Sequence, residues 1–302
     1  MSTHKKITVI GSTNTDMVIK SPSLPRPGET ILGGTFFMTQ GGKGANQAVA
    51  VARLGGELLF VAKTGTDIFG NNMRELLRKD GIDGKYLLTD PVHPSGVALI
   101  IIDEQAENSI VVSSGANGYL LPADLKQIPE VIGDAEIILM QLEIPLETVE
   151  YVAETAFAKE KKVILNPAPG RQLSTRLLEK LYLITPNETE AELISGIKVT
   201  DILSAKQAAV KIHEMGVSSV IITLGSKGAL VYTDSRFELI PAVSVNAVDT
   251  TAAGDVFNGA LTVALCEEES LSAAVQFATR AAALSVTRMG AQDSVPYRHE
   301  IE

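Results

Sequence analysis

The sequence predicts an α/β protein in which helices flank a doubly wound, mostly parallel sheet, and two insertions add a small antiparallel sheet. Short apolar runs rich in β-branched residues alternate with stretches of helical length. Strands that are apolar on both faces and separated by crossover helices are typical of parallel sheets. Two segments without helical crossovers, 15–41 and 96–114, interrupt the alternation and predict the small sheet. With 302 residues, 45% of them apolar, the chain is long enough to bury a large core.

The main domain is expected to span 1–14, 42–95 and 115–302. Its expected strands are at 7–10, 58–62, 137–140, 163–165, 182–185, 220–224 and 229–232. Its expected helices are at 45–54, 71–79, 146–159, 188–194, 204–215, 253–266 and 271–287. Glycines follow several of these helices, as is common at helix C-termini.

The two insertions read as extended chain rather than helix. In the first, prolines separate short strand-like pieces at 17–19 and 30–32. In the second, apolar runs at 97–102 and 110–112 flank a polar turn, which is typical of a β-hairpin. We expect the two insertions to form one accessory sheet, a lid. The alternative is that they add two strands to the edge of the main sheet.

Composition excludes several classes of function. The 36 acidic residues against 26 basic ones give a net charge of −10, which disfavours binding to nucleic acid or to an anionic membrane. One cysteine, Cys266, cannot form an internal disulfide, and no Cys/His zinc pattern is present. No apolar run is long enough for a membrane span, and the N-terminal run is too short for a signal peptide. We therefore expect a cytoplasmic protein with small-molecule partners.

Polar residues follow the first strand and the strand at 137–140. Ligands of open α/β sheets bind outside the carboxyl ends of the strands. Asn14 and Asp16 offer an amide and a carboxylate suited to hydroxyl groups, and Glu143 is expected at the same edge. The alternatives are a turn in which Asn14 and Asp16 bond only to backbone, and a solvated charge at Glu143. The first turn lacks the glycine spacing of a dinucleotide fingerprint, which disfavours an NAD-dependent dehydrogenase.

Two glycine-rich loops are candidate ligand loops. Segment 40–46 leads into a helix, where glycines and free N–H groups allow close approach of a ligand. It is not a Walker A loop, because Lys43 is followed by Gly44 rather than Ser or Thr. The loop at 223–228 lies between two strands and could run beside an adenine or a phosphate. The alternatives are a tight turn without a ligand and a plain hairpin turn.

Segment 249–259 carries the strongest local signal. Small residues and Gly254 lead directly into a long helix, so unpaired N–H groups converge at the positive end of the helix dipole. Such a cup suits the negative charge that develops on a transferring phosphoryl group, and Asp255 lies beside it. The alternative, that Asp255 is only a favourable charge at a helix start, leaves the run of small residues unexplained.

Three segments together, 41–46, 187–190 and 249–255, resemble the PfkB-type (ribokinase family) carbohydrate kinases, and the likeness extends from Gly11 to Pro296. The resemblance implies a doubly wound α/β fold with a β-sheet lid that also forms a homodimer contact. It implies ATP-dependent phosphorylation of the primary 5-hydroxyl of D-ribose, giving ribose 5-phosphate and ADP, with Mg²⁺ and K⁺ as cofactors.

The resemblance also implies roles for individual residues, of which Asp255 is the catalytic base. The amides of Ala252, Ala253 and Gly254 would hold the transferring group. Sugar contacts are implied for Asn14, Asp16, Gly42, Lys43, Asn46, Glu143 and Asp255. ATP contacts are implied for Asn187, Thr223, Gly225, Ser226, Gly228, Gly254 and Thr279, with Glu190 linked to magnesium and phosphate. A potassium site is implied at Asp249 and Thr251, at the backbones of Ser285, Arg288 and Gly290, and at Ser294.

Three rival functions remain open at this point. A related kinase that acts on deoxyribose, another sugar or a nucleoside shares every motif, although Asn46 after the glycine loop favours ribose. An NAD-dependent dehydrogenase lacks support from a glycine fingerprint. A sugar-binding sensor without catalysis would lose the base, whereas Asp255 is present.

Overall fold

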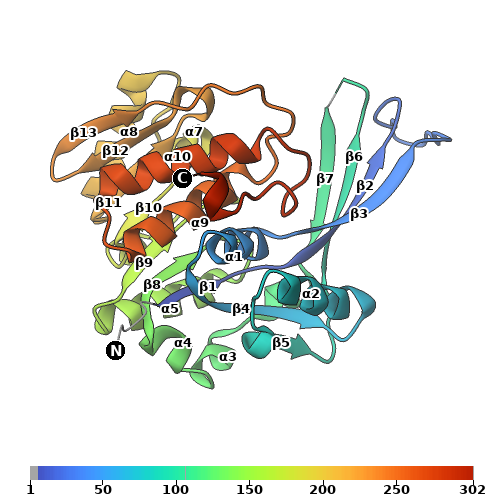
Figure 1. Ribbon diagram of the computed structural model, residues 1–302, viewed down its shortest axis with the longest axis horizontal. Helices are drawn as coiled ribbons and strands as arrows, with labels where there is room; N and C mark the ends of the chain where they lie inside the picture. Colours follow the sequence, from blue (N-terminus) through green and yellow to red (C-terminus); the bar gives the residue numbers. More distant parts are fainter. Residues whose placement is uncertain (1–5, 106, 302) are drawn as a thin grey trace.

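The computed structural model describes residues 6–105 and 107–301, which form two sheets (Figure 1). The main sheet has nine strands in the order β13-β12-β11-β10-β9-β8-β1-β4-β5. Seven parallel strands run from β11 to β5, and β12 and β13 add an antiparallel edge. The strands are β1 (Lys6–Ile10), β4 (Glu57–Gly65), β5 (Leu87–Asp90), β8 (Ala135–Met140), β9 (Lys162–Leu165), β10 (Leu183–Ile184), β11 (Ser219–Thr223), β12 (Ala229–Thr233) and β13 (Arg236–Ile240).

Helices cover both faces of this sheet, and each face has its own apolar core. One core includes residues of α1 (Lys43–Arg53), α2 (Ile68–Lys79), α9 (Ala253–Cys266) and α10 (Leu271–Ser285). The other includes residues of α3 (Pro122–Lys126), α4 (Glu130–Gly133), α5 (Leu146–Ala158), α6 (Thr175–Leu178), α7 (Glu188–Ser195) and α8 (Ile202–Glu214).

Strand β8 shows why the strands are apolar throughout. Ile137 and Leu139 enter the first core, whereas Ile138 and Met140 enter the second. Successive side chains of a strand point to opposite faces of the sheet. A strand covered on both faces therefore needs apolar residues at every position, as the sequence pattern predicted.

The two insertions form a separate four-stranded sheet that projects from the main body (Figure 1). Its order is β3-β2-β6-β7, with β2 (Asn14–Lys20), β3 (Thr35–Gly41), β6 (Gly96–Ile102) and β7 (Asn108–Ser113). A separate small sheet was predicted, and the alternative of two added edge strands is wrong. The sheet is mixed rather than purely antiparallel, because β2 and β6 pair in parallel. Both strands run outward from the carboxyl edge of the main sheet, so they share one direction.

Other sequence-based element predictions need correction. The expected strand at 30–32 is coil, and Leu32 there is 89% exposed. The strand begins at Thr35, after two glycines. Helix α2 begins three residues earlier than expected, because the Asp67 side chain accepts a hydrogen bond from Gly70 N at 3.0 Å and caps the helix. Strands β5 and β13 and the short helices α3, α4 and α6 were not predicted. Among the described residues, no helix combines the length and apolarity that crossing a membrane requires.

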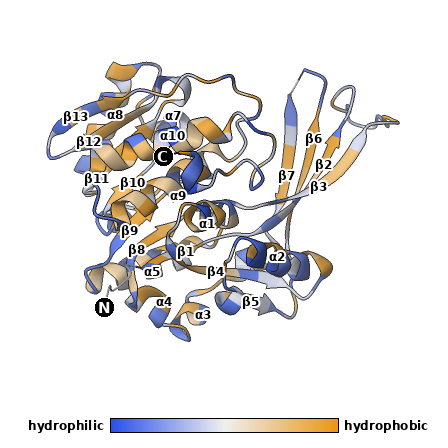
Figure 2. Cartoon of the chain, in the orientation of Figure 1, coloured by the Kyte–Doolittle hydropathy of each residue, from blue (hydrophilic) through white to orange (hydrophobic). Residues whose placement is uncertain are grey.

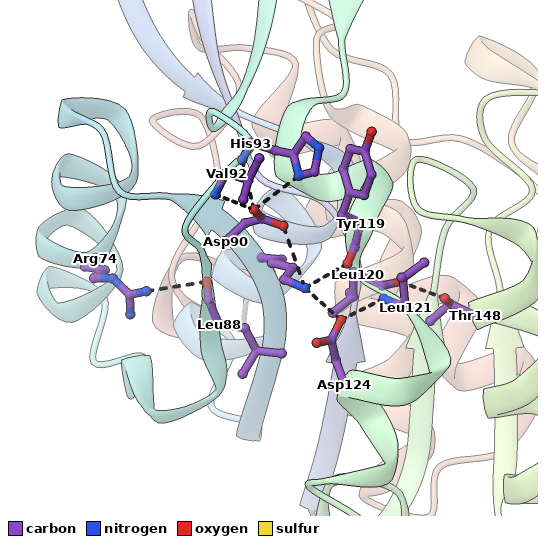
Figure 3. Close-up of polar contacts among 11 residues, drawn as sticks. Arg74, Leu88, Asp90, Val92, His93, Tyr119, Leu120, Leu121, Asp124 and Thr148 are labelled. Carbon is purple, nitrogen blue, oxygen red and sulfur yellow. Dashed lines mark hydrogen bonds and ion pairs between the residues drawn. The ribbon is translucent and has the colours of Figure 1, made fainter.

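Partly buried charged side chains tie the base of the small sheet to the main body (Figure 3). Lys63 on β4 donates from Nζ to Tyr119 O and to Asp124 Oδ2, both at 2.9 Å, and lies 3.9 Å from Asp90 Oδ2. Asp90 in turn accepts hydrogen bonds from the backbone and ring of His93, whose ring stacks on Tyr119. These five residues, called the lid base below, join the chain that enters β6 to the chain that leaves β7.

Candidate active site

Three segments meet at the carboxyl edge of the main sheet through one carboxylate. Glu143, just after β8, accepts hydrogen bonds on Oε2 from Ser12 Oγ at 2.5 Å and from Lys43 N at 3.0 Å. The Ser12 hydroxyl in turn accepts from Gly44 N at 3.3 Å. Glu143 is therefore not a solvated strand-end charge, since it links the first turn to the start of α1.

The glycine loop packs tightly on the first turn. Gly42 has φ of +88°, and a Cβ there would lie 2.7 Å from Asn14 N. Only glycine accommodates both this conformation and this contact without strain. The loop therefore holds Lys43 and Asn46 at the start of α1, directly beside Asn14.

Asn14 and Asp16 lie at the start of β2. Asn14 Oδ1 accepts from Asn117 Nδ2 at 2.9 Å, and Asn117 also bonds to the backbone of Thr13. Asn117, in the 3₁₀ turn Gly115–Tyr119, thus connects the first turn to the end of the second insertion. Burial, and then the negative charge of Glu143, raises the pKa of Asp16 to about 6.

Asp255 is buried in the first turn of α9, with only 5% of its surface exposed. Its Oδ2 accepts from Asn46 Nδ2 at 3.0 Å, and its Oδ1 accepts from Gln47 Nε2 at 2.9 Å. Burial raises the pKa of Asp255 above its ordinary value, while the Lys43 charge and the two amides act in the opposite direction.

The residues before Asp255 form a tight helix start. Ala252 is the N-cap residue, with φ of 60° and ψ of 9°, a left-handed conformation that is uncommon outside glycine. Apart from its two chain neighbours and the nearby backbone of its own helix, no atom lies within 4 Å of a Cβ built on Gly254. The helix start therefore borders open space, and its first N–H groups lack partners within the helix.

The positively charged Lys43 side chain lies among several acidic side chains. Burial alone would lower the pKa of Lys43, but the charges of Asp255, Glu143 and Glu190 raise it above its ordinary value. Lys43 is therefore protonated at neutral pH. Burial raises the pKa of Glu190, and a hydrogen bond from Asn187 N opposes that shift.

The residues expected to contact ATP fall into two groups. Asn187 caps α7, accepting from Glu190 N at 2.8 Å, and forms a parallel bridge with Thr223. The loop after Thr223, which includes Gly225, Ser226 and Gly228, is also the hairpin turn between β11 and β12. Among the described residues, no hydrogen bond joins this group to Thr279 on α10. The Thr279 Oγ1 atom is buried and has no hydrogen-bond partner in the described part of the chain.

The residues expected to bind potassium lie around one carboxylate. Asp249 Oδ1 accepts from Thr251 N at 2.9 Å and from Thr251 Oγ1 at 2.6 Å, and Asp249 Oδ2 accepts from Gly290 N at 2.9 Å. Burial alone would raise the pKa of Asp249, but these hydrogen bonds lower it. Ser285 ends α10 and Arg288 lies in the turn that follows, where Arg288 N donates to Ser285 O at 3.0 Å.

Ser294 completes the set expected for potassium and lies in the segment that follows that turn. Its hydroxyl donates to Ala291 O at 2.9 Å. The expected ligand atoms are carboxylate, hydroxyl and backbone carbonyl oxygens, which suit an alkali cation. The described residues contain no cluster of three or more His, Cys, Asp or Glu side chains that would hold a metal ion.

Several site residues were not predicted from the sequence. Ser12, Gln47 and Asn117 each contact a predicted residue, but no role was predicted for any of them. One feature of the sequence could have identified Gln47. It is a large polar residue within the helix of small and apolar residues at 45–54, and such a side chain is buried only when it is hydrogen-bonded.

Comparison with known proteins places the chain in a family. A family model for pfkB family carbohydrate kinases matches residues 4–298. The ribokinase of Haemophilus influenzae is 45% identical over 297 residues, which cover 98% of this chain and 97% of that protein. The deoxyribokinase of Salmonella typhi is 38% identical, covering 96% of this chain and 95% of that protein. The solved structure of Arabidopsis thaliana ribokinase complexed with ribose and ATP matches with a TM-score of 0.92 at 32% identity, covering 98% of this chain and 97% of that one.

The chain belongs to the pfkB family of carbohydrate kinases. It is a phosphotransferase that acts on a sugar. The family resemblance drawn from its motifs is confirmed.

Proposed function

We propose that this carbohydrate kinase transfers the γ-phosphoryl group of ATP to the primary 5-hydroxyl of D-ribose, giving ribose 5-phosphate and ADP. The observation that carries the proposal is the buried Asp255 carboxylate at the start of α9, bonded to Asn46 and next to the open space at Gly254. The names of the ribokinase relatives support ribose as the sugar. Consumption of ATP favours a cytoplasmic location.

Asp255 serves as the general base in this proposal. Phosphoryl transfer passes through a loose transition state, so the protein mainly aligns the groups and stabilises charge. Asp255 takes the proton of the attacking hydroxyl as the new bond forms. The amides of Ala252, Ala253 and Gly254 hold the transferring group. The Ala253 amide now donates to Thr250 O at 3.3 Å, a long bond that an anionic acceptor would replace.

The sugar lies against the acid-rich side of the site. We assign its hydroxyl contacts to the residues gathered around the first turn and the glycine loop, namely Asn14, Asp16, Gly42, Lys43, Asn46 and Glu143. Two features support this assignment. The Asn46 Oδ1 atom is buried without a partner among the described residues, and a sugar hydroxyl would supply the missing donor. Carboxylates accept hydrogen bonds from hydroxyls, whereas they would repel a phosphate.

ATP is assigned to the other side, along Asn187, Glu190, Thr223, Gly225, Ser226, Gly228, Gly254 and Thr279. The unpaired Thr279 hydroxyl supports this side as the nucleotide site. Magnesium, when bound with the nucleotide near Glu190, would offset the charge of its phosphates. Potassium would be held by Asp249 and Thr251 with oxygens of Ser285, Arg288, Gly290 and Ser294. It would fix the backbone just before Ala252 without touching the sugar.

The two insertions, 15–41 and 96–114, would act as a lid over the sugar and exclude water. We propose that the outer face of the lid binds a second copy of this chain. Cross-strand register places five exposed apolar residues on the face opposite to Asp16, namely Ile19, Phe36, Met38, Leu99 and Val111. Figure 2 shows hydrophobic colour along these strands. An apolar face of this kind is typical of a protein–protein contact.

A coupled assay of ADP release over a panel of sugars tests the proposal. The panel contains D-ribose, 2-deoxy-D-ribose, D-fructose and adenosine, each with potassium or with sodium only. We expect the highest kcat/KM with D-ribose and a clear drop without potassium. The deoxyribokinase relative makes 2-deoxy-D-ribose the second candidate, and a higher kcat/KM for that sugar would replace ribose. Equal rates in sodium and potassium would contradict the cation site.

A further inference from the structure

Gln47 occupies the centre of a buried amide network behind Asp255. It is fully buried, and its Nε2 donates to Asp255 Oδ1 at 2.9 Å and to Asn166 Oδ1 at 3.0 Å. Its Oε1 accepts from Gln141 Nε2 at 2.5 Å. These partners come from α9 and from the ends of β9 and β8. Gln47 is thus held from three directions, with its donors toward Asp255 and Asn166.

The neighbouring amide, Asn46, is bound differently. Its Nδ2 donates to Asp255 Oδ2, but its Oδ1 is buried without a partner among the described residues. Successive residues of an α-helix point about 100° apart, so the two amides reach Asp255 from different sides. A buried acceptor without a donor destabilises the side-chain position. Asn46 therefore keeps an acceptor free for a hydroxyl-bearing ligand, whereas Gln47 is already satisfied.

We propose that Gln47 is a positioning residue that holds Oδ1 of Asp255 and thereby leaves Oδ2 as the oxygen that receives the proton of the acceptor hydroxyl. This inference rests on the proposed kinase function. In the transfer step the hydroxyl O–H bond breaks and its proton moves to Oδ2. The hydroxyl oxygen forms the bond to the γ-phosphorus, and the bond from that phosphorus to the bridging oxygen breaks, its electron pair leaving with ADP.

Loss of Gln47 also has an electrostatic consequence. The charged groups facing Asp255 are Lys43 at the start of α1, Glu143 after β8 and Glu190 on α7. Burial raises the pKa of Asp255, and the Gln47 amide is one of the groups that oppose the rise. Without it, the carboxylate is harder to ionise, so the acidic limb of the kcat–pH profile moves to higher pH.

Two substitutions of similar size separate positioning from packing. Gln47→Met removes both donors, and we expect kcat at neutral pH to fall about tenfold or more, as for loss of a hydrogen bond to a charged acceptor. Its acidic limb should rise, while the KM for the sugar stays within about twofold, because Gln47 does not touch the sugar. Gln47→Glu keeps an oxygen for Gln141 but sets a second carboxyl against Asp255 Oδ1. The two carboxyls would share a proton, so kcat should fall further than in Gln47→Met.

A residue that only fills space predicts a nearly unchanged kcat and acidic limb in Gln47→Met, because Met is close to Gln in size. Gln47→Met with the kcat or the acidic limb of the unmodified protein would therefore overturn the proposal, as would Gln47→Glu more active than Gln47→Met. Thr262→Val is the matched control, since Thr262 is fully buried on α9 and its hydroxyl donates to Asn258 O within the same helix. We expect its pH profile to match that of the unmodified protein.

A ¹³C NMR titration of the Asp255 carboxyl in the ligand-free protein separates the two proposals. It does not depend on turnover. A raised pKa in Gln47→Met relative to the unmodified protein supports the role of Gln47, and an unchanged pKa overturns it. Absence of sugar phosphorylation by the unmodified protein would instead remove the proposed function.

Discussion

At the residue scale, the acidic side chains around Lys43 determine which ligand charges the site accepts. Its ammonium is set against Asp255, Glu143 and Glu190, which together raise its pKa. With these groups ionised, the cluster carries more negative than positive charge before any ligand binds. Neutral sugar hydroxyls fit such surroundings, whereas a nucleotide triphosphate needs the N–H groups at the helix starts and a metal ion. The charge pattern thus separates the two proposed subsites.

Asp255→Asn tests the proposed base directly. The amide keeps the size of the side chain and a partner for Asn46 or Gln47 but cannot accept the hydroxyl proton. We expect kcat to fall by about 10² or more, the usual contribution of a general base. ATP affinity, measured by calorimetry, should change little, because the nucleotide is assigned to other residues. Steady-state turnover close to that of the unmodified protein would remove Asp255 from this role.

Asp16 should make stability depend on pH in an unusual direction. Its pKa of about 6 lies above the ordinary value of 3.8, so folding disfavours its ionised form. Protonated Asp16 contributes to the free energy of unfolding in full below about pH 4, and this contribution disappears as pH rises through 6. At 1.36 kcal/mol per pKa unit, Asp16 costs about 3 kcal/mol of stability at pH 7.

Asp16→Asn should therefore increase the free energy of unfolding at pH 7 by up to about 3 kcal/mol, measured by urea denaturation without sugar. The difference from the unmodified protein should shrink at pH 4.5. The variant should also bind the sugar less tightly, since it loses a carboxylate acceptor. An equal or lower stability at pH 7 would contradict the assigned ionisation of Asp16.

At the element scale, periodicity predicted the buried strands and long helices but missed elements with little apolar character. Strand β13 is exposed at four of its five residues, and β5 has only four residues. Their positions follow from backbone pairing with neighbours, which the local sequence does not encode strongly. The position of strand β3 was predicted wrongly for the same reason. Its exposed apolar residues lack the alternation of a half-buried strand.

The lid base gives a prediction at this scale. Lys63 has a side chain only 12% exposed and links Asp90, Asp124 and Tyr119. Hydrogen bonds from His93 N and Val92 N, assisted by the His93 ring, lower the pKa of Asp90 to about 2, so this carboxylate stays charged when Lys63 is removed. Lys63→Met should reduce the free energy of unfolding by about 3 kcal/mol, as for a buried pair that loses one partner. The KM for the sugar should rise, because the lid base then holds β6 less firmly.

Lys211→Met is the matched control for this experiment. Lys211 lies 3.9 Å from Glu214 on the surface of α8, with 53% of its side chain exposed. An exposed pair of this kind contributes about 0.5 kcal/mol or less. Urea denaturation of both variants should therefore show a large loss for Lys63→Met alone. Equal losses would mean that the lid base is not a specific support.

At the scale of the whole molecule, the site unites residues that lie far apart in the chain. Asp255 bonds to Asn46 across 209 positions and to Gln47 across 208. The sequence placed Asn14, Lys43 and Asp255 at strand ends and helix starts, and the shared carboxyl edge of a parallel sheet then implied their convergence. It could not indicate the partners of Gln47 or Asn117, because buried amide pairs leave no spacing pattern.

The exposed face of the lid makes a prediction about assembly. Leu99 lies at the centre of that face, between Met17 on β2 and Val111 on β7, and is 52% exposed. If a second copy covers this face, Leu99→Lys places a charge in an apolar contact and should convert a dimer into a monomer in sedimentation velocity. Ile68→Lys is the control, because Ile68 is 67% exposed on α2, outside the small sheet. Asp16 points from the opposite face, so the monomer keeps its sugar contacts. A rise in the KM for the sugar would mean that the second copy holds the lid in place. A monomeric unmodified protein, or dissociation by Ile68→Lys alone, would contradict a lid-to-lid dimer.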